Sequence, residues 1–487
     1  MISRFTSLDL QQWPSYVTTV VVSVVATLLL AWLYRHWRST WTLAKKAKQF
    51  TSEKIRESSP VRAVLGPNDS PTLALERIVI KDFKNIELLD LPLMLKSSLA
   101  GNWSCIAGIN GAGKSAILQA ICIVLLGERN VAELGQTRLK RMIRRTATGP
   151  APTTASIEAW VRHGNEQATR LAMHLNAEGI DEHKLRDESD YQSMRQLWDK
   201  MKSEVLVSYG AARNLTQDED TRNQSLAIQV RRQMTLFDPL TRIADVDVLI
   251  KGGKEPQRRT LQRLLEQVID KEEMGVSVQG ERLVFGRKGT KVDAIDLPDG
   301  FRSTVAWLAD LCAAWHESAP SNTARLTDPS QITGIVLLDE IDLHLHPSLS
   351  RSIVPALRRA LPRVQFVVST HSPLILSSFD RSELIVLEAN EEGVVSTREL
   401  DRQLFAFSMD EVYKWLMRTP PRSTVMEEKI AQGDDSNVAS YLYQSAGRSP
   451  GHEGVNEADS KLLVNDLERL LKDVKEKGER GPEGGSS

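Results

Sequence analysis

Residues 106–118, IAGINGAGKSAIL, combine three glycines with a lysine and a serine at a fixed spacing. The pattern G-x-x-x-x-G-K-S is typical of a loop whose backbone N–H groups turn around an anion. Its lysine reaches the β- and γ-phosphates, and its serine can ligate Mg²⁺. The segment therefore predicts a site for ATP and Mg²⁺. The residues expected to contact the nucleotide are Gly108, Asn110, Gly111, Ala112, Gly113, Lys114 and Ser115.

Two adjacent carboxylates follow a second apolar run, in GIVLLDEID at residues 334–342. The apolar residues predict a buried parallel strand, and Asp339 and Glu340 come at its carboxyl end, where α/β sheets place their ligands. We expect Asp339 to hold Mg²⁺ together with Ser115. Glu340 is expected to be the general base that polarises the attacking water.

A histidine follows a third apolar run, VQFVVST at residues 364–370. His371 precedes Ser372 and Pro373, and a proline is typical of the first position of a helix. His371 should therefore lie at the same edge of the sheet as Asp339. There its imidazole can donate a hydrogen bond to a γ-phosphate and respond to the loss of that phosphate.

These residues need parallel strands that bring their loops to one edge of a sheet. Residues 102–109 predict a strand that enters the phosphate loop, and residues 115–127 predict an apolar helix that leaves it and ends at Gly127. Residues 73–93 alternate as a strand pair would, and residues 155–175 predict a β-hairpin. The order of strands and helices predicts an α/β fold.

The N-terminus has the composition of a membrane span. Residues 16–34 contain no charged side chain and match the about 20 residues that a helix needs to cross a bilayer. Lysines and arginines follow this segment and hardly precede it, which predicts that residues 1–15 lie outside the cytoplasm and the main body inside. We expect a single-pass protein of the bacterial inner membrane, with a juxtamembrane linker at 35–72. A cleaved signal peptide and a buried soluble helix are the alternatives.

The charges of the chain nearly cancel, with 62 lysines and arginines against 63 aspartates and glutamates. Any contact with nucleic acid must therefore be local. The basic cluster RLKRMIRR at 138–145 is either a solvated helix face or a contact for a DNA or RNA backbone. The three cysteines lie in apolar stretches without a C-x-x-C pair, which favours buried thiols over disulfides or a zinc site.

Four motifs in this order resemble the ABC-type ATPases of the SMC, RecF and OLD group. They are the phosphate loop, LPDGFRSTVAWLADL at 297–311, LLDEIDLHLHP at 337–347 and VVSTHSP at 367–373. DEIDLHLHP, SYGAARN, TLFDPL and DGFRS narrow the resemblance to bacterial antiphage defence ATPases of the Septu and retron-associated type. It implies a P-loop ATPase head over 73–390, with a mixed sheet, flanking helices, an antiparallel β-subdomain and a helical insertion at about 176–270.

The resemblance also implies roles for single residues. Lys114 and Ser115 would bind phosphate and Mg²⁺, and Asp339 would support the Mg²⁺ ion. Glu340 would be the catalytic base and His371 the switch. In this family two heads enclose two ATP molecules, and each site takes its signature helix from the opposite subunit. A homodimer or higher oligomer is therefore implied.

Three further positions follow from the same resemblance. Lys84 and Asn85 in KDFKNIE occupy the place where RecF-like heads touch the nucleotide. Gly300 belongs to the signature, whose transporter form L-S-G-G-Q is here LPDGF and lacks the serine. Its N–H group and the start of the following helix could still contact a phosphate. The segment VSYGAARN stands where a Q-loop would be and contains no glutamine.

The C-terminal part predicts a partner region rather than a second active site. Residues 391–474 predict helices, and residues 475–487 predict a disordered tail. The region contains aromatic residues that either anchor a partner or pack on the core, together with an amphipathic helix after Ala458. These aromatic residues are Phe405, Phe407, Tyr413, Trp415, Tyr441 and Tyr443.

The resemblance implies a separate effector protein, a nuclease or another toxic protein, because no active site for a toxic reaction is recognisable in the chain. Three alternatives remain: a transporter subunit, an ATPase of DNA repair or nucleic-acid processing, and a nuclease with its own catalytic domain. One predicted span argues against a transporter. The segment after His371 holds no spaced acidic cluster suited to two metals, which argues against a nuclease.

Overall fold

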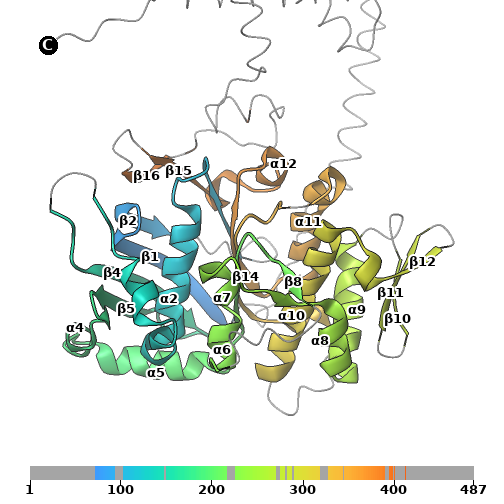
Figure 1. Cartoon of the computed structure of the whole chain (residues 1–487), viewed down its shortest axis with the longest axis horizontal. Coiled ribbons are helices and arrows are strands. Elements are labelled where there is room, and N and C mark those ends of the chain that lie inside the picture. The colour runs from blue at the N-terminus through green and yellow to red at the C-terminus, as the bar shows by residue number, and fades with distance from the viewer. Residues whose placement is uncertain are drawn as a thin grey trace, which may run out of the picture. The chain divides into compact units, whose positions relative to one another are not determined.

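In the computed structural model the chain divides into two units, 1–68 with 96–100 and 69–95 with 101–487. The described residues are 72–93, 102–146, 150–216, 225–269, 275–279, 282–287, 290–318, 327–343, 345–389, 394–398, 400 and 412. All of them belong to the second unit. Figure 1 draws the helices and strands in colour. The predicted membrane helix, its linker up to residue 71, the six aromatic residues and the tail lie outside the described residues.

A six-stranded mixed sheet carries the loops that the sequence analysis singles out. Its strands pair in parallel except for the edge strand β16, which is antiparallel to β15. The strand order is β16 (Val395–Arg398), β15 (Leu384–Ala389), β3 (Asn102–Ala107), β14 (Val364–Thr370), β13 (Gly334–Leu338) and β7 (Leu206–Tyr209). The parallel pairing brings the carboxyl ends of β3, β13 and β14 to one edge, which confirms the predicted α/β fold.

Both faces of this sheet are buried. In β13, Val336 and Leu338 belong to one hydrophobic cluster, whereas Ile335 and Leu337 belong to the other. Successive side chains of a strand point to opposite faces, so a strand buried on both sides is a continuous apolar run. This is why GIVLL predicts a core strand without any alternation of polar residues.

One face of the sheet is covered by α2 (Lys114–Ala132), which continues the phosphate loop. On its far side, α2 packs against an antiparallel sheet of five strands (Figure 1). Their order is β2 (Ile86–Pro92), β1 (Leu73–Phe83), β4 (Ala155–His163), β5 (Thr169–Asn176) and β6 (Gly179–Ile180). Among the described residues, α2 is the one helix long and apolar enough to cross a membrane, but it lies in the core.

The helix α2 continues beyond Gly127, where the sequence predicts its end. Gly127 has φ 77° and ψ 165°, so the helix bends there and then runs on to Ala132. A Cβ atom added to Gly127 would lie 2.8 Å from Cγ of Trp198. Glycine is therefore required by a left-handed backbone and by a close aromatic neighbour, not by a helix end.

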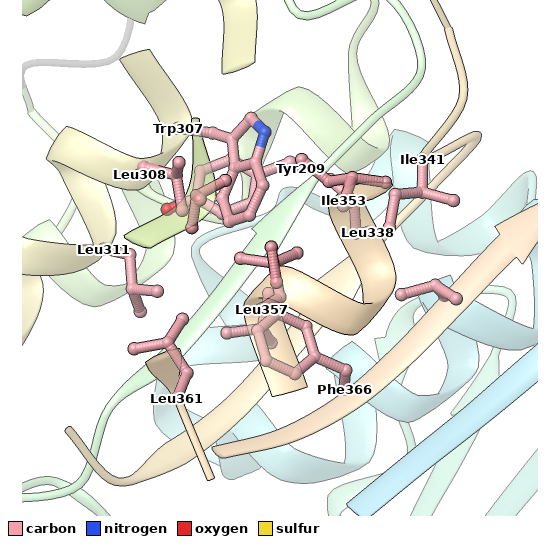
Figure 2. Packing of buried hydrophobic residues seen from close by; sticks show 14 of the residues in the cluster. Tyr209, Trp307, Leu308, Leu311, Leu338, Ile341, Ile353, Leu357, Leu361 and Phe366 are labelled. Atoms are coloured by element: carbon pink, nitrogen blue, oxygen red, sulfur yellow. The ribbon is translucent and has the colours of Figure 1, made fainter. Parts of the chain in front are cut away.

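The opposite face of the six-stranded sheet is covered by several helices, which Figure 2 shows in part. Trp307, Leu308 and Leu311 pack with residues of a neighbouring helix against Leu338 and Phe366 of the sheet. The helices are α8 (Val246–Gly252), α9 (Glu255–Val268), α10 (Asp299–Ser318) and α11 (Pro347–Ala360). A three-stranded antiparallel sheet contacts α8 and α9, with β10 (Gly275–Gln279), β11 (Arg282–Arg287) and β12 (Thr290–Asp293).

The range 176–270 is not a purely helical insertion, because β7 within it is an edge strand of the six-stranded sheet. The four residues of β7 are too few for their pattern to be told from that of the flanking helices. The remaining elements are α3 (Gln136–Lys140), α4 (Glu182–Arg186), α5 (Tyr191–Met201), α6 (Ile228–Arg231), α7 (Met234–Phe237), α12 (Pro373–Leu376), β8 (Leu215–Thr216) and β9 (Ile243–Ala244).

Candidate active site

A pocket of about 510 Å³ opens where the phosphate loop, the β1–β2 turn and the end of β13 meet. Three segments that are far apart in the sequence therefore line the same pocket. The residues that line the pocket are Lys84, Asn85, Asn110, Gly111, Gly113, Lys114, Ser115, Ala116 and Glu340.

The phosphate loop depends on two glycines with positive φ, Gly111 at 84° and Gly113 at 99°. Asn85 braces the loop, since its Nδ2 donates a hydrogen bond of 3.0 Å to the carbonyl of Gly111. A Cβ atom at Gly113 would approach the Asn85 amide to 3.3 Å. Asn85 thus supports the loop from the β1–β2 turn, in addition to lining the pocket.

The ammonium group of Lys114 lies inside the loop. Its Nζ donates hydrogen bonds to the carbonyls of Gly108, at 2.9 Å, and of Ile109, at 3.1 Å. Burial lowers the pKa of Lys114, and the nearby carboxylates of Glu340 and Asp339 partly oppose this. Within the part of the chain that the structure describes, no ion pair balances this buried cation, which is therefore suited to an anionic ligand such as a triphosphate.

Ser115 and Asp339 are joined directly, because Ser115 Oγ donates a hydrogen bond of 2.6 Å to Asp339 Oδ2. The other oxygen, Asp339 Oδ1, accepts a hydrogen bond from Ser369 Oγ. The backbone N–H of Asp339 donates to the carbonyl of Tyr209 at 2.8 Å, so the neighbouring strand also holds this residue. Hydroxyl and carboxylate oxygens are the ligands that Mg²⁺ prefers, and this pair therefore fits the predicted Mg²⁺ site.

Glu340 lines the pocket with a left-handed backbone, at φ 48°. Its N–H donates a hydrogen bond of 2.8 Å to Ser369 Oγ, and its carbonyl accepts one of 2.6 Å from Arg213 Nη2. The carboxylate lies with Lys114 and Ser115 in one pocket, where a general base for an attacking water is needed.

His371 lies at the same edge of the sheet but does not line the pocket. Its Nε2 is 3.9 Å from Asp342 Oδ2, and its side chain is 44% exposed. Among the described residues, Nδ1 is buried without a hydrogen-bond partner. Asp342 also accepts a hydrogen bond from Thr370 Oγ1.

The remaining predicted residues take different places. Lys84 has φ 53° in the β1–β2 turn and lines the pocket, and burial lowers its pKa. Ala112 is buried within the loop. Gly300 is the second residue of α10 and does not line this pocket of its own chain.

Three residues at this site carry no role in the sequence analysis: Arg213, Asp342 and Ser369. Asp342 and Ser369 stand within motifs quoted there, two positions from Glu340 and His371 respectively. Arg213 stands in SYGAARN, a segment that contributes to the family resemblance and replaces a Q-loop but gives no role to its arginine. Its contact with Glu340 spans 127 positions, so no local pattern could have indicated it.

The basic cluster 138–145 lies on α3 and the turn after it. Arg138 and Arg141 line a second pocket of about 640 Å³, and Lys84 lines both pockets. Arg138 Nη2 is 3.7 Å from Asp238, and Arg144 is paired with Glu87 at 2.9 Å. Part of the cluster is therefore neutralised locally.

Residues 104–377, more than half of the chain, match the family model described as "AAA domain, putative AbiEii toxin, Type IV TA system". The chain is 28% identical over 324 residues to the Septu protein PtuA of Bacillus mycoides (strain KBAB4), a match that covers 65% of this chain and 41% of that protein. It is 26% identical over 175 residues to the Retron Ec83 probable ATPase of Escherichia coli, covering 34% of this chain and 31% of that protein. The matches thus span less than half the length of these relatives.

Among solved structures, the SMC head domain from Thermotoga maritima resembles the chain with a TM-score of 0.43. The sequence identity is 14%, and the superposition covers 67% of this chain and 99% of the head domain.

Proposed function

The chain belongs to this family of AAA-type ATPase domains, and from that premise we propose that it is a membrane-anchored ATPase whose nucleotide state controls a separate effector protein in antiphage defence. The observation that carries the ATPase part is one pocket that combines Lys114, Ser115 and Glu340, with Asp339 bonded to Ser115. The similarity to proteins named for Septu and retron systems supports the defence part.

The chemistry assigns one task to each side chain. Lys114 gives up its hydrogen bonds to the loop carbonyls and donates to phosphate oxygens of ATP. Ser115 and Asp339 would hold Mg²⁺, which neutralises phosphate charge when it is bound with ATP. Glu340 accepts a proton from water as the water oxygen bonds to the γ-phosphorus and the bond to the β–γ bridging oxygen breaks. ADP and phosphate are the products.

Phosphate release from ATP by the purified full chain tests this assignment. Glu340→Gln should still bind ATP but hydrolyse it about 10²- to 10⁴-fold more slowly, because the amide cannot accept the proton. The matched control is Glu317→Gln, which changes an exposed carboxylate that pairs with Arg232 away from the pocket. Wild-type turnover by Glu340→Gln would show that this carboxylate is not the base.

We propose further that two copies complete each other's site. Gly300 lies buried at the start of α10 and does not line the pocket of its own chain. The support for a role in the site of a second copy is the resemblance to ATPases whose signature helix comes from the opposite subunit. The N-terminus of a helix of 20 residues is a favourable place for a phosphate. His371, beside the pocket and next to Asp342, would respond to the γ-phosphate.

The effector would be a protein encoded beside this one, a nuclease or another toxic enzyme, bound by residues 391–474. The support is the resemblance to Septu and retron systems and the aromatic content of that region. Co-purification from cells that express both genes tests it, with a truncation after Leu400 as the comparison. An equal yield of partner on the truncated chain would exclude the C-terminal region as its binding site.

Nucleic acid is a further ligand that the second pocket favours. Arg138, Arg141 and Lys84 line it, and Lys84 also lines the ATP pocket, so a bound phosphate backbone would lie next to the nucleotide. This arrangement supports the alternative role in nucleic-acid processing. Stimulation of ATP hydrolysis by DNA or RNA, with loss in Arg141→Ala, is the result that would favour it.

A further inference from the structure

Glu340 has a backbone conformation that costs free energy. Its φ of 48° lies in the left-handed region, which is unfavourable for residues with a Cβ atom. Such a conformation persists only where the surrounding structure holds it, and it is common at active sites. Neighbouring groups must therefore hold the backbone of Glu340 in this conformation.

Two side chains bind the two polar groups of the Glu340 backbone. Ser369, at the end of β14, accepts a hydrogen bond of 2.8 Å from the N–H of Glu340. Arg213 donates a hydrogen bond of 2.6 Å from Nη2 to the Glu340 carbonyl. The residue is thus fixed from both sides, by segments that lie 29 and 127 positions away in the sequence.

Arg213 can reach the Glu340 carbonyl because of the position of β7, the strand that precedes it. Tyr209, the last residue of β7, is paired with Leu338, the last residue of β13. The two parallel strands therefore end together, and the loop after β7 runs beside Asp339 and Glu340. Arg213 itself has φ 32° and does not line the ATP pocket, so it can act on the nucleotide only through other residues.

Nearby carboxylates stabilise the charged form of the Arg213 side chain. The side chain is buried, with 4% of the residue exposed. Burial lowers the pKa of Arg213 to about 10, and the carboxylates of Asp339, Asp342 and Glu340 oppose this shift. The guanidinium therefore remains charged at neutral pH and sits among three acidic groups of the site.

We propose that Arg213 is a positioning residue for ATP hydrolysis: it fixes the backbone of Glu340 so that the general-base carboxylate faces the phosphate pocket. The proposal rests on the proposed role of Glu340 as the base. It assigns a function to the SYGAARN segment, which stands in place of a glutamine-containing Q-loop.

A double-mutant cycle on the full chain tests the proposal. Arg213→Gln should lower kcat about 10- to 100-fold, no more than the about 10²- to 10⁴-fold expected for loss of the base itself, while the Kd for ATP stays nearly unchanged. In the Glu340→Gln background, Arg213→Gln should have no further effect on kcat, because the group it positions is already lost. Independent, multiplying effects of the two substitutions would overturn the proposal, as would a wild-type kcat for Arg213→Gln.

Two variants separate positioning from folding. Arg213→Gly suits the left-handed backbone, so it should fold, and millimolar guanidinium should restore part of its kcat when NaCl does not. Absence of rescue at an unchanged Tm would overturn the proposal.

Arg358→Gln is the matched control. Arg358 lies outside the pocket and binds the buried Glu383 through its two terminal nitrogens, Nη1 and Nη2. It should lower Tm and leave kcat per folded molecule unchanged.

The proposed function and this inference fail differently. If Glu340→Gln hydrolyses ATP at the wild-type rate, Glu340 is not the base, and the role proposed for Arg213 is refuted as well. If Glu340→Gln is slow but a folded Arg213→Gln keeps the wild-type kcat, only the role of Arg213 is refuted.

Discussion

The hydroxyl of Ser115 donates a 2.6 Å hydrogen bond to Asp339 Oδ2, across 224 positions of the chain. This hydrogen bond joins the helix after the phosphate loop to the residue after β13, at the wall of the pocket that Ser115 lines. Because the two oxygens are already adjacent, a divalent cation could bind with little rearrangement of the protein.

Removal of either oxygen should therefore weaken the response to Mg²⁺. In Ser115→Ala and Asp339→Asn, hydrolysis should fall by about 10²-fold or more, since a catalytic cation supplies several kcal/mol of charge stabilisation. The Mg²⁺ concentration for half-maximal ATP binding should rise. Ser203→Ala, which removes a hydroxyl from a surface turn, is the control. Unchanged Mg²⁺ titrations in both site variants would exclude the pair as ligands.

Lys114→Ala should weaken ATP binding by about 10- to 100-fold. It removes a cation whose charge-assisted hydrogen bonds each contribute about 1.5–3 kcal/mol, and it leaves the carbonyls of Gly108 and Ile109 without their donor. Isothermal titration with ATP measures the effect. Equal affinities of the variant and the wild type would contradict the phosphate-loop assignment.

ATP should drive association of the Glu340→Gln protein, because that variant binds ATP and hardly hydrolyses it. Light scattering in detergent should detect a larger species with ATP than with ADP. Gly300→Asp, which places a negative charge at the start of α10, should prevent the increase. A single species of constant mass with and without saturating ATP would disprove the two-copy site.

The full chain should fractionate with the inner membrane, and a chain that starts at residue 69 should not. A tag at residue 1 should be accessible from outside the cytoplasm and a tag at residue 487 should be protected, as the distribution of basic residues predicts. Protease protection in spheroplasts measures this. The reverse pattern of accessibility would refute the predicted orientation.

The three thiols should be unreactive in the native protein. Cys105, Cys122 and Cys312 are buried, and burial raises the pKa of Cys122 to about 12. A raised thiol pKa leaves almost no thiolate at pH 8, and the thiolate is the reactive form. Ellman's reagent should therefore detect three thiols only after denaturation. Fast labelling of the folded chain would contradict the burial of these residues.

The sequence predicts those residues of the site that belong to short local patterns. The phosphate loop lies within one segment, and Asp339, Glu340 and His371 each follow a short apolar run that predicts a buried strand. Parallel strands with both faces covered must bring these ends to one edge, so their proximity could be predicted without knowing the strand order.

The parts that the sequence does not predict depend on pairing between distant segments. Arg213 contacts Glu340 only because β7 pairs with β13, and four residues of β7 are too few to indicate that pairing. Gly127 resembles a helix end in the sequence, yet it is needed for a bend against Trp198. In both cases tertiary contacts decide what a local pattern leaves open.

The order of strands in the central sheet has a consequence for synthesis on the ribosome. The strand β3, which leads into the phosphate loop, lies between β15 and β14, and both are translated more than 250 positions later. The strand β3 and the phosphate loop therefore lack their hydrogen-bonded neighbour strands until most of the chain has been translated. A nascent chain cannot acquire a complete ATPase site until residues 364–389 have left the ribosome. An effector that depends on this site would be controlled only by chains in which β14 and β15 have already been translated.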